Sequence, residues 1–260
     1  MSRKFNQTDT LDGLVQEYER EIGKEYGFIS GNTTRLKAFT SATRSAWDRY
    51  LHLALKSSGT HQFDDSNHED YPFIEADLVA NQRDITYTTD DNSTFILDIF
   101  KVMLKNSDGV YFELQPIDQQ YRGQGMSIWD GQSATGTPTQ YDKTANGIIF
   151  DVLPNYNWRQ ATEGERGVKM FVNREASYFT YTDTTKLPGC PGIHHDYFFL
   201  RPALEYAGRN NLANYDDLRD RVKEFEGDER NGVVGMIENY FSRRSKDERY
   251  IMSMKKINYI

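Results

Sequence analysis

The sequence predicts an α+β fold in which a helical bundle carries an inserted β-rich module and an extended C-terminal arm. Near both ends of the chain, apolar residues recur at three- and four-residue steps, the period of amphipathic helices. The middle of the chain instead holds β-branched and aromatic runs that are separated by turn residues. We therefore expect four parts: helical residues 1–70, the β-rich module 71–180, helical residues 181–242 and the arm 243–260.

Composition excludes several classes of protein. The chain has 260 residues, a formal net charge of −8 and 13% aromatic residues, so it is long enough to form its own core. Its single cysteine, Cys190, excludes an internal disulfide framework, and no run approaches the roughly 18 apolar residues of a membrane helix. Proteins that read DNA grooves are normally basic, although an acidic surface still lets a duplex slide past without sticking.

The N-terminal part predicts two helices, over residues 11–23 and 33–57. In the first, residues such as Leu14, Val15 and Tyr18 fall on one face. The apolar stripe of the second consists of Leu36, Phe39, Thr43, Ala46, Trp47, Tyr50, Leu51 and Ala54. We expect these helices to form an antiparallel hairpin.

The middle of the chain predicts strands. Residues 94–104 and 110–117 are rich in β-branched and aromatic side chains, and they flank the turn sequence Lys-Asn-Ser-Asp-Gly. This arrangement is typical of a β-hairpin. Shorter strands are expected at 139–141, 147–153 and 168–172.

A helical pattern returns after Pro191. Pro202 lies within it, and we expect this proline to kink or restart the helix because it lacks an N–H donor. Asp216 or Asp217 then caps a further helix, and Gly227 separates that helix from a last helical stretch over 233–241.

One candidate for chemistry is the group Cys190, His194, His195 and Asp196. Cysteine and histidine bind zinc or form nucleophilic pairs. Adjacent histidines on a helix, however, point about 100° apart and rarely share one metal ion. We therefore interpret this segment as a turn that leads into a helix.

A second candidate is a loop rich in acids and histidines. It contains His61, Asp64, Asp65, His68 and Asp70. Their spacing does not match an EF-hand loop, so a solvated loop is the better interpretation. Nucleotide-binding glycine loops and a nucleophile elbow are also absent from the sequence. We expect no catalytic residues, no cofactor, no metal and no enzymatic activity.

The last residues favour a docking arm. Residues 243–260 carry six basic and two acidic residues, a net charge of +4 on an otherwise acidic chain. Residues 250–260 are also unusually rich in large apolar side chains for a terminus, and several of these alternate as in an extended segment that adds to a partner. The predicted partner-binding residues are Arg243, Arg244, Tyr250, Met252, Met254, Lys255, Lys256, Ile257 and Tyr259.

Four phrases carry a family resemblance. They are HQFDDSNHEDYPFIEADL, LDIFKVMLKNSDGVYFELQPID, GTPTQYDKTANGIIFDVLP and FTYTDTTKLPGCPGIHHDYFFLRPALEYA, and they lie within residues 35–210. In these phrases the chain resembles the head-to-tail adaptor (connector) proteins of tailed bacteriophages.

The resemblance implies a virion structural protein in the neck, between head and tail, that is made in the host cytoplasm. Such adaptors form homo-oligomeric rings, usually twelvefold, that dock on the portal protein and receive a tail or nozzle protein. Genomic DNA passes through the lumen during ejection without sequence-specific contact, and no membrane is involved. Their C-terminal arms commonly reach into the portal.

Two other functions stay open at this point. A tail-tube or nozzle component would also form a ring, with its β-rich module at the lumen or the tail tip. A hydrolase carried in the tail would need a cleft with convergent acids, and the sequence identifies none.

Overall fold

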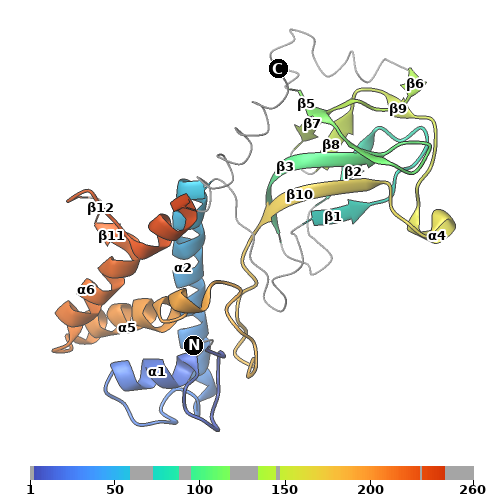
Figure 1. Cartoon of the computed structure of the whole chain (residues 1–260). Coiled ribbons are helices and arrows are strands. Elements are labelled where there is room, and N and C mark those ends of the chain that lie inside the picture. The colour runs from blue at the N-terminus through green and yellow to red at the C-terminus, as the bar shows by residue number, and fades with distance from the viewer. Residues whose placement is uncertain are drawn as a thin grey trace. The chain divides into compact units, whose positions relative to one another are not determined.

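A computed structural model of the chain has helices and several β-sheets, which confirms the predicted α+β class (Figure 1). It divides into two compact units. A helical unit combines residues 1–70 with 176–260, and a β unit spans Tyr71–Glu175. The structure describes residues 3–58, 73–87, 95–117, 134–144, 147–228 and 230–243.

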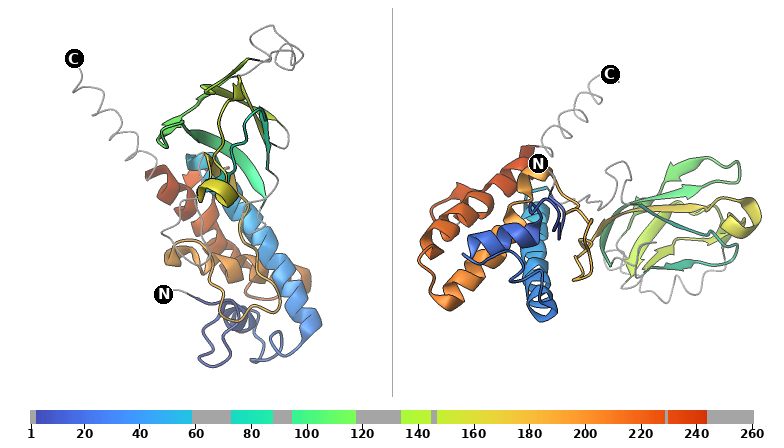
Figure 2. Two further views of the ribbon diagram at one scale, coloured as in Figure 1. Left: turned by 90° about the vertical axis from the view of Figure 1, so that its right-hand side faces the viewer. Right: turned by 90° about the horizontal axis from the view of Figure 1, so that it is seen from below.

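The helical unit is arranged around one central helix. Its elements are α1 (Leu14–Glu21), α2 (Thr33–Ser58), the 3-10 turn η2 (Gly192–His194), α5 (Tyr197–Asn210), α6 (Tyr215–Glu226), the two-strand hairpin β11 (Gly227–Asp228) and β12 (Val233–Val234), and helical residues 236–243. Helix α5 packs against α1, α2 and α6 (Figures 1 and 2). Both ends of the chain therefore contribute to one core.

Large aromatic rings fill that core. Trp47 and Tyr50 of α2 are buried against Tyr197 and Phe198 of α5. The ring centroids of Tyr50 and Phe198 lie 5.5 Å apart, within the range of favourable aromatic pairs. The apolar stripe expected for residues 33–57 accordingly faces α5.

Helix α5 corrects the expectation at Pro202, because it runs through this proline as one element. The missing N–H costs one backbone hydrogen bond. The apolar face of the same helix, which includes Phe198, Leu200 and Ala203, is almost completely buried. Burial of that face offsets the lost bond.

The expected helix over 233–241 is wrong at its start, because Val233 and Val234 form strand β12 and helical geometry begins at residue 236. Gly227 and Gly235 explain the difference. Gly227 has a φ of +83°, and a Cβ at Gly235 would lie 2.3 Å from the Phe225 carbonyl oxygen. The two backbones approach too closely here for a helix to continue.

The β unit consists mainly of two four-stranded sheets. The first has the order β1-β10-β3-β4 and is antiparallel; the second has the order β2-β8-β7-β5, with a parallel β5–β7 pair. A short parallel pair, β6–β9, and helix α4 complete the unit. The strands are β1 (Phe73–Ala76), β2 (Asp84–Thr86), β3 (Ile96–Lys105), β4 (Tyr111–Glu113), β5 (Gln115–Pro116), β6 (Thr135–Gly136), β7 (Gln140–Thr144), β8 (Gly147–Phe150), β9 (Leu153–Pro154) and β10 (Val168–Arg174); α4 spans Gln160–Glu163.

The predicted hairpin is confirmed, since β3 pairs antiparallel with β4. Asn106 stabilises its turn by accepting hydrogen bonds at its side-chain oxygen from the backbone N–H groups of Asp108 and Val110. Gly109 supplies the positive φ of +83° that the turn requires. Leu114 then links β4 directly to β5, so one stretch of chain joins the two sheets.

Candidate functional site

The structure describes one of the predicted arm residues. Arg243 is exposed at the end of helical residues 236–243. The others, Arg244, Tyr250, Met252, Met254, Lys255, Lys256, Ile257 and Tyr259, lie outside the described residues.

The cluster around Cys190 is buried and hydrogen-bonded. The Nδ1 atom of His195 accepts a hydrogen bond from the Arg3 backbone N–H at 2.9 Å. Its Nε2 atom lies 3.0 Å from the Cys190 carbonyl oxygen and donates to it. His195 thereby ties the N-terminal segment to the turn that precedes α5, as a structural residue does.

His194 has a different environment. Its Nδ1 atom forms a 2.6 Å hydrogen bond with the Tyr50 hydroxyl, and its imidazole ring is fully buried. Burial lowers the pKa of His194 to about 4 and raises the pKa of the Cys190 thiol. A neutral imidazole and a protonated thiol at neutral pH suit a packed core better than a nucleophilic pair.

The described residues contain no group of three or more His, Cys, Asp or Glu side chains that could hold a metal ion. The second sequence candidate falls elsewhere: His61, Asp64, Asp65, His68 and Asp70 lie outside the described part of the chain.

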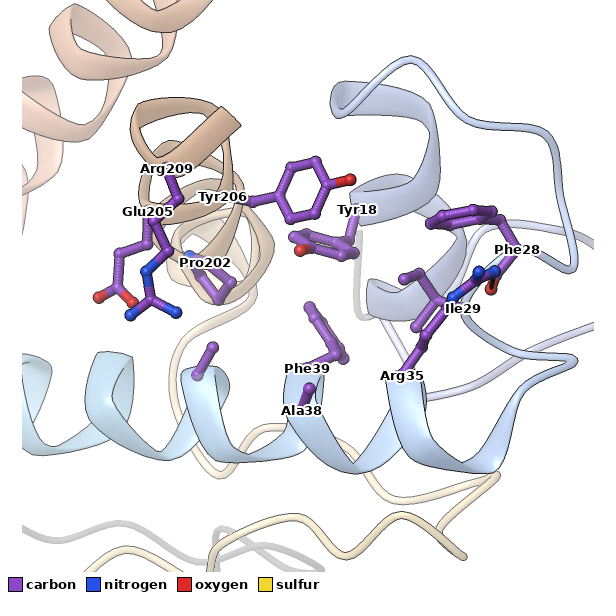
Figure 3. Close-up of a pocket in the computed structure, with 11 residues that line it drawn as sticks. Tyr18, Phe28, Ile29, Arg35, Ala38, Phe39, Pro202, Glu205, Tyr206 and Arg209 are labelled. Carbon is purple, nitrogen blue, oxygen red and sulfur yellow. Dashed lines mark hydrogen bonds between the residues drawn. The ribbon is translucent and has the colours of Figure 1, made fainter. Parts of the chain in front are cut away.

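A pocket in the helical unit is a candidate site for an interaction (Figure 3). It has a volume of about 220 Å³ and lies among α1, α2, α5 and the loop between α1 and α2. Its lining residues are Tyr18, Phe28, Ile29, Arg35, Ala38, Phe39, Ala42, Pro202, Glu205, Tyr206 and Arg209.

Glu19 fixes the loop that forms one wall of this pocket. Its carboxylate is fully buried and accepts hydrogen bonds from the backbone N–H groups of Gly27, Ile29 and Ser30. Charge-assisted bonds of this kind are stronger than neutral ones. They hold Phe28 and Ile29 in place at the pocket.

Aromatic rings form the floor of the pocket. The Tyr18 ring lies 4.5 Å from Phe39 and 6.2 Å from Tyr206, measured between centroids. Figure 3 shows these three rings gathered between α1, α2 and α5. Burial raises the pKa of Tyr18, so its hydroxyl stays protonated over the physiological range.

Charged groups surround the opening. The guanidinium of Arg35 stacks on Phe28 at 3.8 Å and donates to the Phe28 carbonyl oxygen at 3.1 Å. Glu205 has Arg201 as an ion-pair partner at 3.8 Å. Arg209 is exposed, and among the described residues neither Arg35 nor Arg209 forms an ion pair. The rim thus carries two guanidinium groups, Arg35 and Arg209, and the Glu205 carboxylate, which pairs with Arg201.

The chemistry of this pocket favours a side chain over a metabolite. Small-molecule sites usually occupy about 300–1,000 Å³, which exceeds the 220 Å³ available here. Apolar cavities of about 150 Å³ already accept a group as large as benzene. One apolar side chain of a protein therefore fits the aromatic floor, and a carboxylate next to it can pair with an arginine at the rim.

Sequence reasoning did not identify this pocket. It placed Tyr18 and Phe39 on buried helix stripes, which is where they lie. The gap between them is created by the loop that Glu19 holds and by the angle of α5, neither of which has a periodic signal.

None of the helices in the described residues is long and apolar enough to span a membrane. No protein family matches this sequence, and no curated protein matches it.

Proposed function

We propose that this chain is a structural adaptor of a tailed-bacteriophage virion. Copies of it form a ring in the neck, dock on the portal protein and receive a tail or nozzle protein, with DNA passing through the lumen. It works without a cofactor and without breaking bonds. The proposal extends the resemblance carried by residues 35–210.

The observation that carries this proposal is the construction of the helical unit from both ends of the chain, with the β unit inserted between them. The adaptors that the chain resembles combine a helical bundle with a β-rich extension in the same way. An acidic chain, with a net charge of −8, also suits a channel that DNA crosses without sticking.

A structural role is further supported by the environment of the candidate acid–base groups. His194 and His195 are buried, and their hydrogen bonds are made within the fold. The pocket, by contrast, is suited to a protein side chain. Both features favour contact between proteins over chemistry on a substrate.

The arm supplies the portal contact in this proposal. Arg243, Arg244, Lys255 and Lys256 would meet acidic portal surface. Tyr250, Met252, Met254, Ile257 and Tyr259 would fill apolar pockets. Charged groups at such a rim mainly speed association, whereas buried apolar groups supply most of the affinity.

Truncation after Ser242 tests this assignment. The last core residue of the described part is Phe241, so the shortened chain keeps the complete core of the helical unit. We expect an unchanged melting temperature and loss of binding to the portal protein of the same virion, measured by surface plasmon resonance. Equal binding by the truncated chain would contradict the role of the arm.

A particle reconstruction tests the position of the ring. The adaptor function requires density for this chain directly beneath the portal. Density along the tail tube or at the tail tip would instead identify a tube or nozzle component.

A further inference from the structure

The helical unit exposes an apolar side chain in an unfavourable backbone conformation. Leu11 has a φ of +57° and is 39% exposed. Positive φ is disfavoured for a leucine, because its Cβ crowds the backbone, and asparagine or glycine tolerates it better. A leucine at this position strains the backbone and buries little apolar surface in the core. The stability of the fold alone therefore does not account for it.

Two carboxylates flank this leucine. Asp9 and Asp12 are exposed on either side of Leu11, and among the described residues neither side chain has an ion-pair partner. The Asp12 carboxylate accepts a hydrogen bond from the nearby Thr10 hydroxyl. We call Asp9, Leu11 and Asp12 the knob.

The pocket described above has the complementary features. Its aromatic floor suits one apolar side chain, and its volume of about 220 Å³ is sufficient for a leucine. Its rim carries Arg35 and Arg209, neither of which forms an ion pair with another described residue. Figure 3 shows Arg35 next to Phe28 and Arg209 next to Glu205 among the lining residues. We call this pocket the socket.

Knob and socket are made of different residues of the helical unit. Leu11 precedes α1, whereas Tyr18, the α1 residue of the socket, lies in the second turn of that helix. A copy can therefore offer its knob to one neighbour and its socket to another. A contact of this kind is heterologous and generates a ring when the rotation closes.

We propose that the knob of one copy inserts into the socket of a second copy of this chain. Leu11 enters the aromatic floor, and Asp9 and Asp12 pair with Arg35 and Arg209 at the rim. This contact deepens the proposed function, since it names a surface through which the ring would assemble. The charged rim makes the contact weaker at high salt.

Two single substitutions test each side of the contact in the full-length chain. Leu11→Asn removes the apolar knob and relieves the backbone, because asparagine tolerates a positive φ. Ala38→Phe fills the socket from an exposed position on α2, where a larger side chain does not enter the core. Ile193→Asn and Ser41→Phe are the matched controls, since both positions are exposed and lie outside the knob and the socket.

Sedimentation velocity at low ionic strength and increasing protein concentration gives the readout. The unaltered chain and both controls should form species heavier than the monomer. Leu11→Asn and Ala38→Phe should each stay monomeric while melting no earlier than the unaltered chain. An equimolar mixture of the two variants should stop at a 1:1 dimer, because the mixture retains one intact knob and one intact socket.

Two results would overturn the contact. If the unaltered chain remains monomeric at every concentration, the knob does not bind the socket. If rings form but neither variant changes them, the contact is wrong while the adaptor function stands. The adaptor function is tested separately: density for this chain away from the portal in the virion particle would contradict it.

Discussion

His194 is a titratable side chain enclosed by aromatic rings. The rings of Tyr50 and Tyr240 lie 5.6 Å and 5.3 Å from its imidazole. Within the described part of the chain, its Nε2 atom is buried without a hydrogen-bond partner. A proton added to this ring would place an unpaired charge in the core, so burial lowers its pKa to about 4, with a smaller contribution from His195.

This lowered pKa predicts how stability depends on pH. An unfolded histidine binds its proton near pH 6.5, whereas folded His194 stays neutral down to about pH 4. The unfolded state therefore binds more protons in this window. The free energy of unfolding should be highest above pH 6.5 and fall by about 3 kcal/mol as the pH drops toward 4.

Urea denaturation at pH 7 and pH 4.5 measures this effect. The variant His194→Gln should lose much of the pH dependence, even if it is less stable overall. His52→Gln, at an exposed position on α2, should keep it. An identical slope for His194→Gln and the unaltered chain would show that another group is responsible.

For single residues, the sequence predicted the local backbone structure better than it predicted burial and contacts. The turn chemistry around Cys190 predicted a turn that leads into a helix, and the structure has the 3-10 turn η2 followed by α5 there. The burial of the two adjacent histidines could not be read from spacing, because it depends on Tyr50 and Arg3, which lie far away in the chain. The same is true of Leu11, whose positive φ follows from how its segment meets α1.

Strand β8 approaches its neighbour β2 closely at Gly147. Gly147 faces the Ile85 backbone across the β2–β8 pair, and a Cβ at this glycine would lie 2.1 Å from the Ile85 carbonyl oxygen. A Cβ atom and a carbonyl oxygen that are not bonded to each other do not approach so closely. The strand pair therefore requires glycine at this position.

Gly147→Ala should separate β8 from β2 and lower the free energy of unfolding of the β unit by about 2–3 kcal/mol. Gly136→Ala is the control, since the nearest atom to its added Cβ would be the Val152 Cγ2 atom at 3.9 Å. Chemical denaturation followed by circular dichroism compares the two variants. Equal stability of both variants would mean that the β2–β8 pair adjusts freely.

Long elements with a strong apolar period were predictable, whereas the bounds of the shortest elements were not. The expected helix over 33–57 matches α2 because its stripe is continuous, and the expected strand over 168–172 lies within β10. Strands β5, β6 and β9 have two residues each. They exist because of parallel pairing between distant segments, which leaves no local pattern.

Taken as a whole, the molecule has two separate hydrophobic cores. One cluster surrounds Trp47 and Phe198 in the helical unit, and the other surrounds Val102 and Phe150 between the sheets of the β unit. The two clusters share no residue. Units with separate cores unfold independently unless a large interface couples them.

Two transitions are therefore expected in differential scanning calorimetry of the full-length chain. Gly147→Ala should move one of them to lower temperature and leave the other unchanged, which assigns the shifted transition to the β unit. A single transition that shifts as a whole would show that the two cores melt together.

The inserted position of the β unit has a consequence for biosynthesis. As the ribosome makes the chain, α1 and α2 leave the exit tunnel long before α5, which carries their packing partners Tyr197 and Phe198. All of Tyr71–Glu175 is translated in between. The β unit can thus fold on the nascent chain before α5 is made, while the apolar faces of α1 and α2 are still exposed. A chaperone that recognises such faces would have its longest opportunity to bind during that interval.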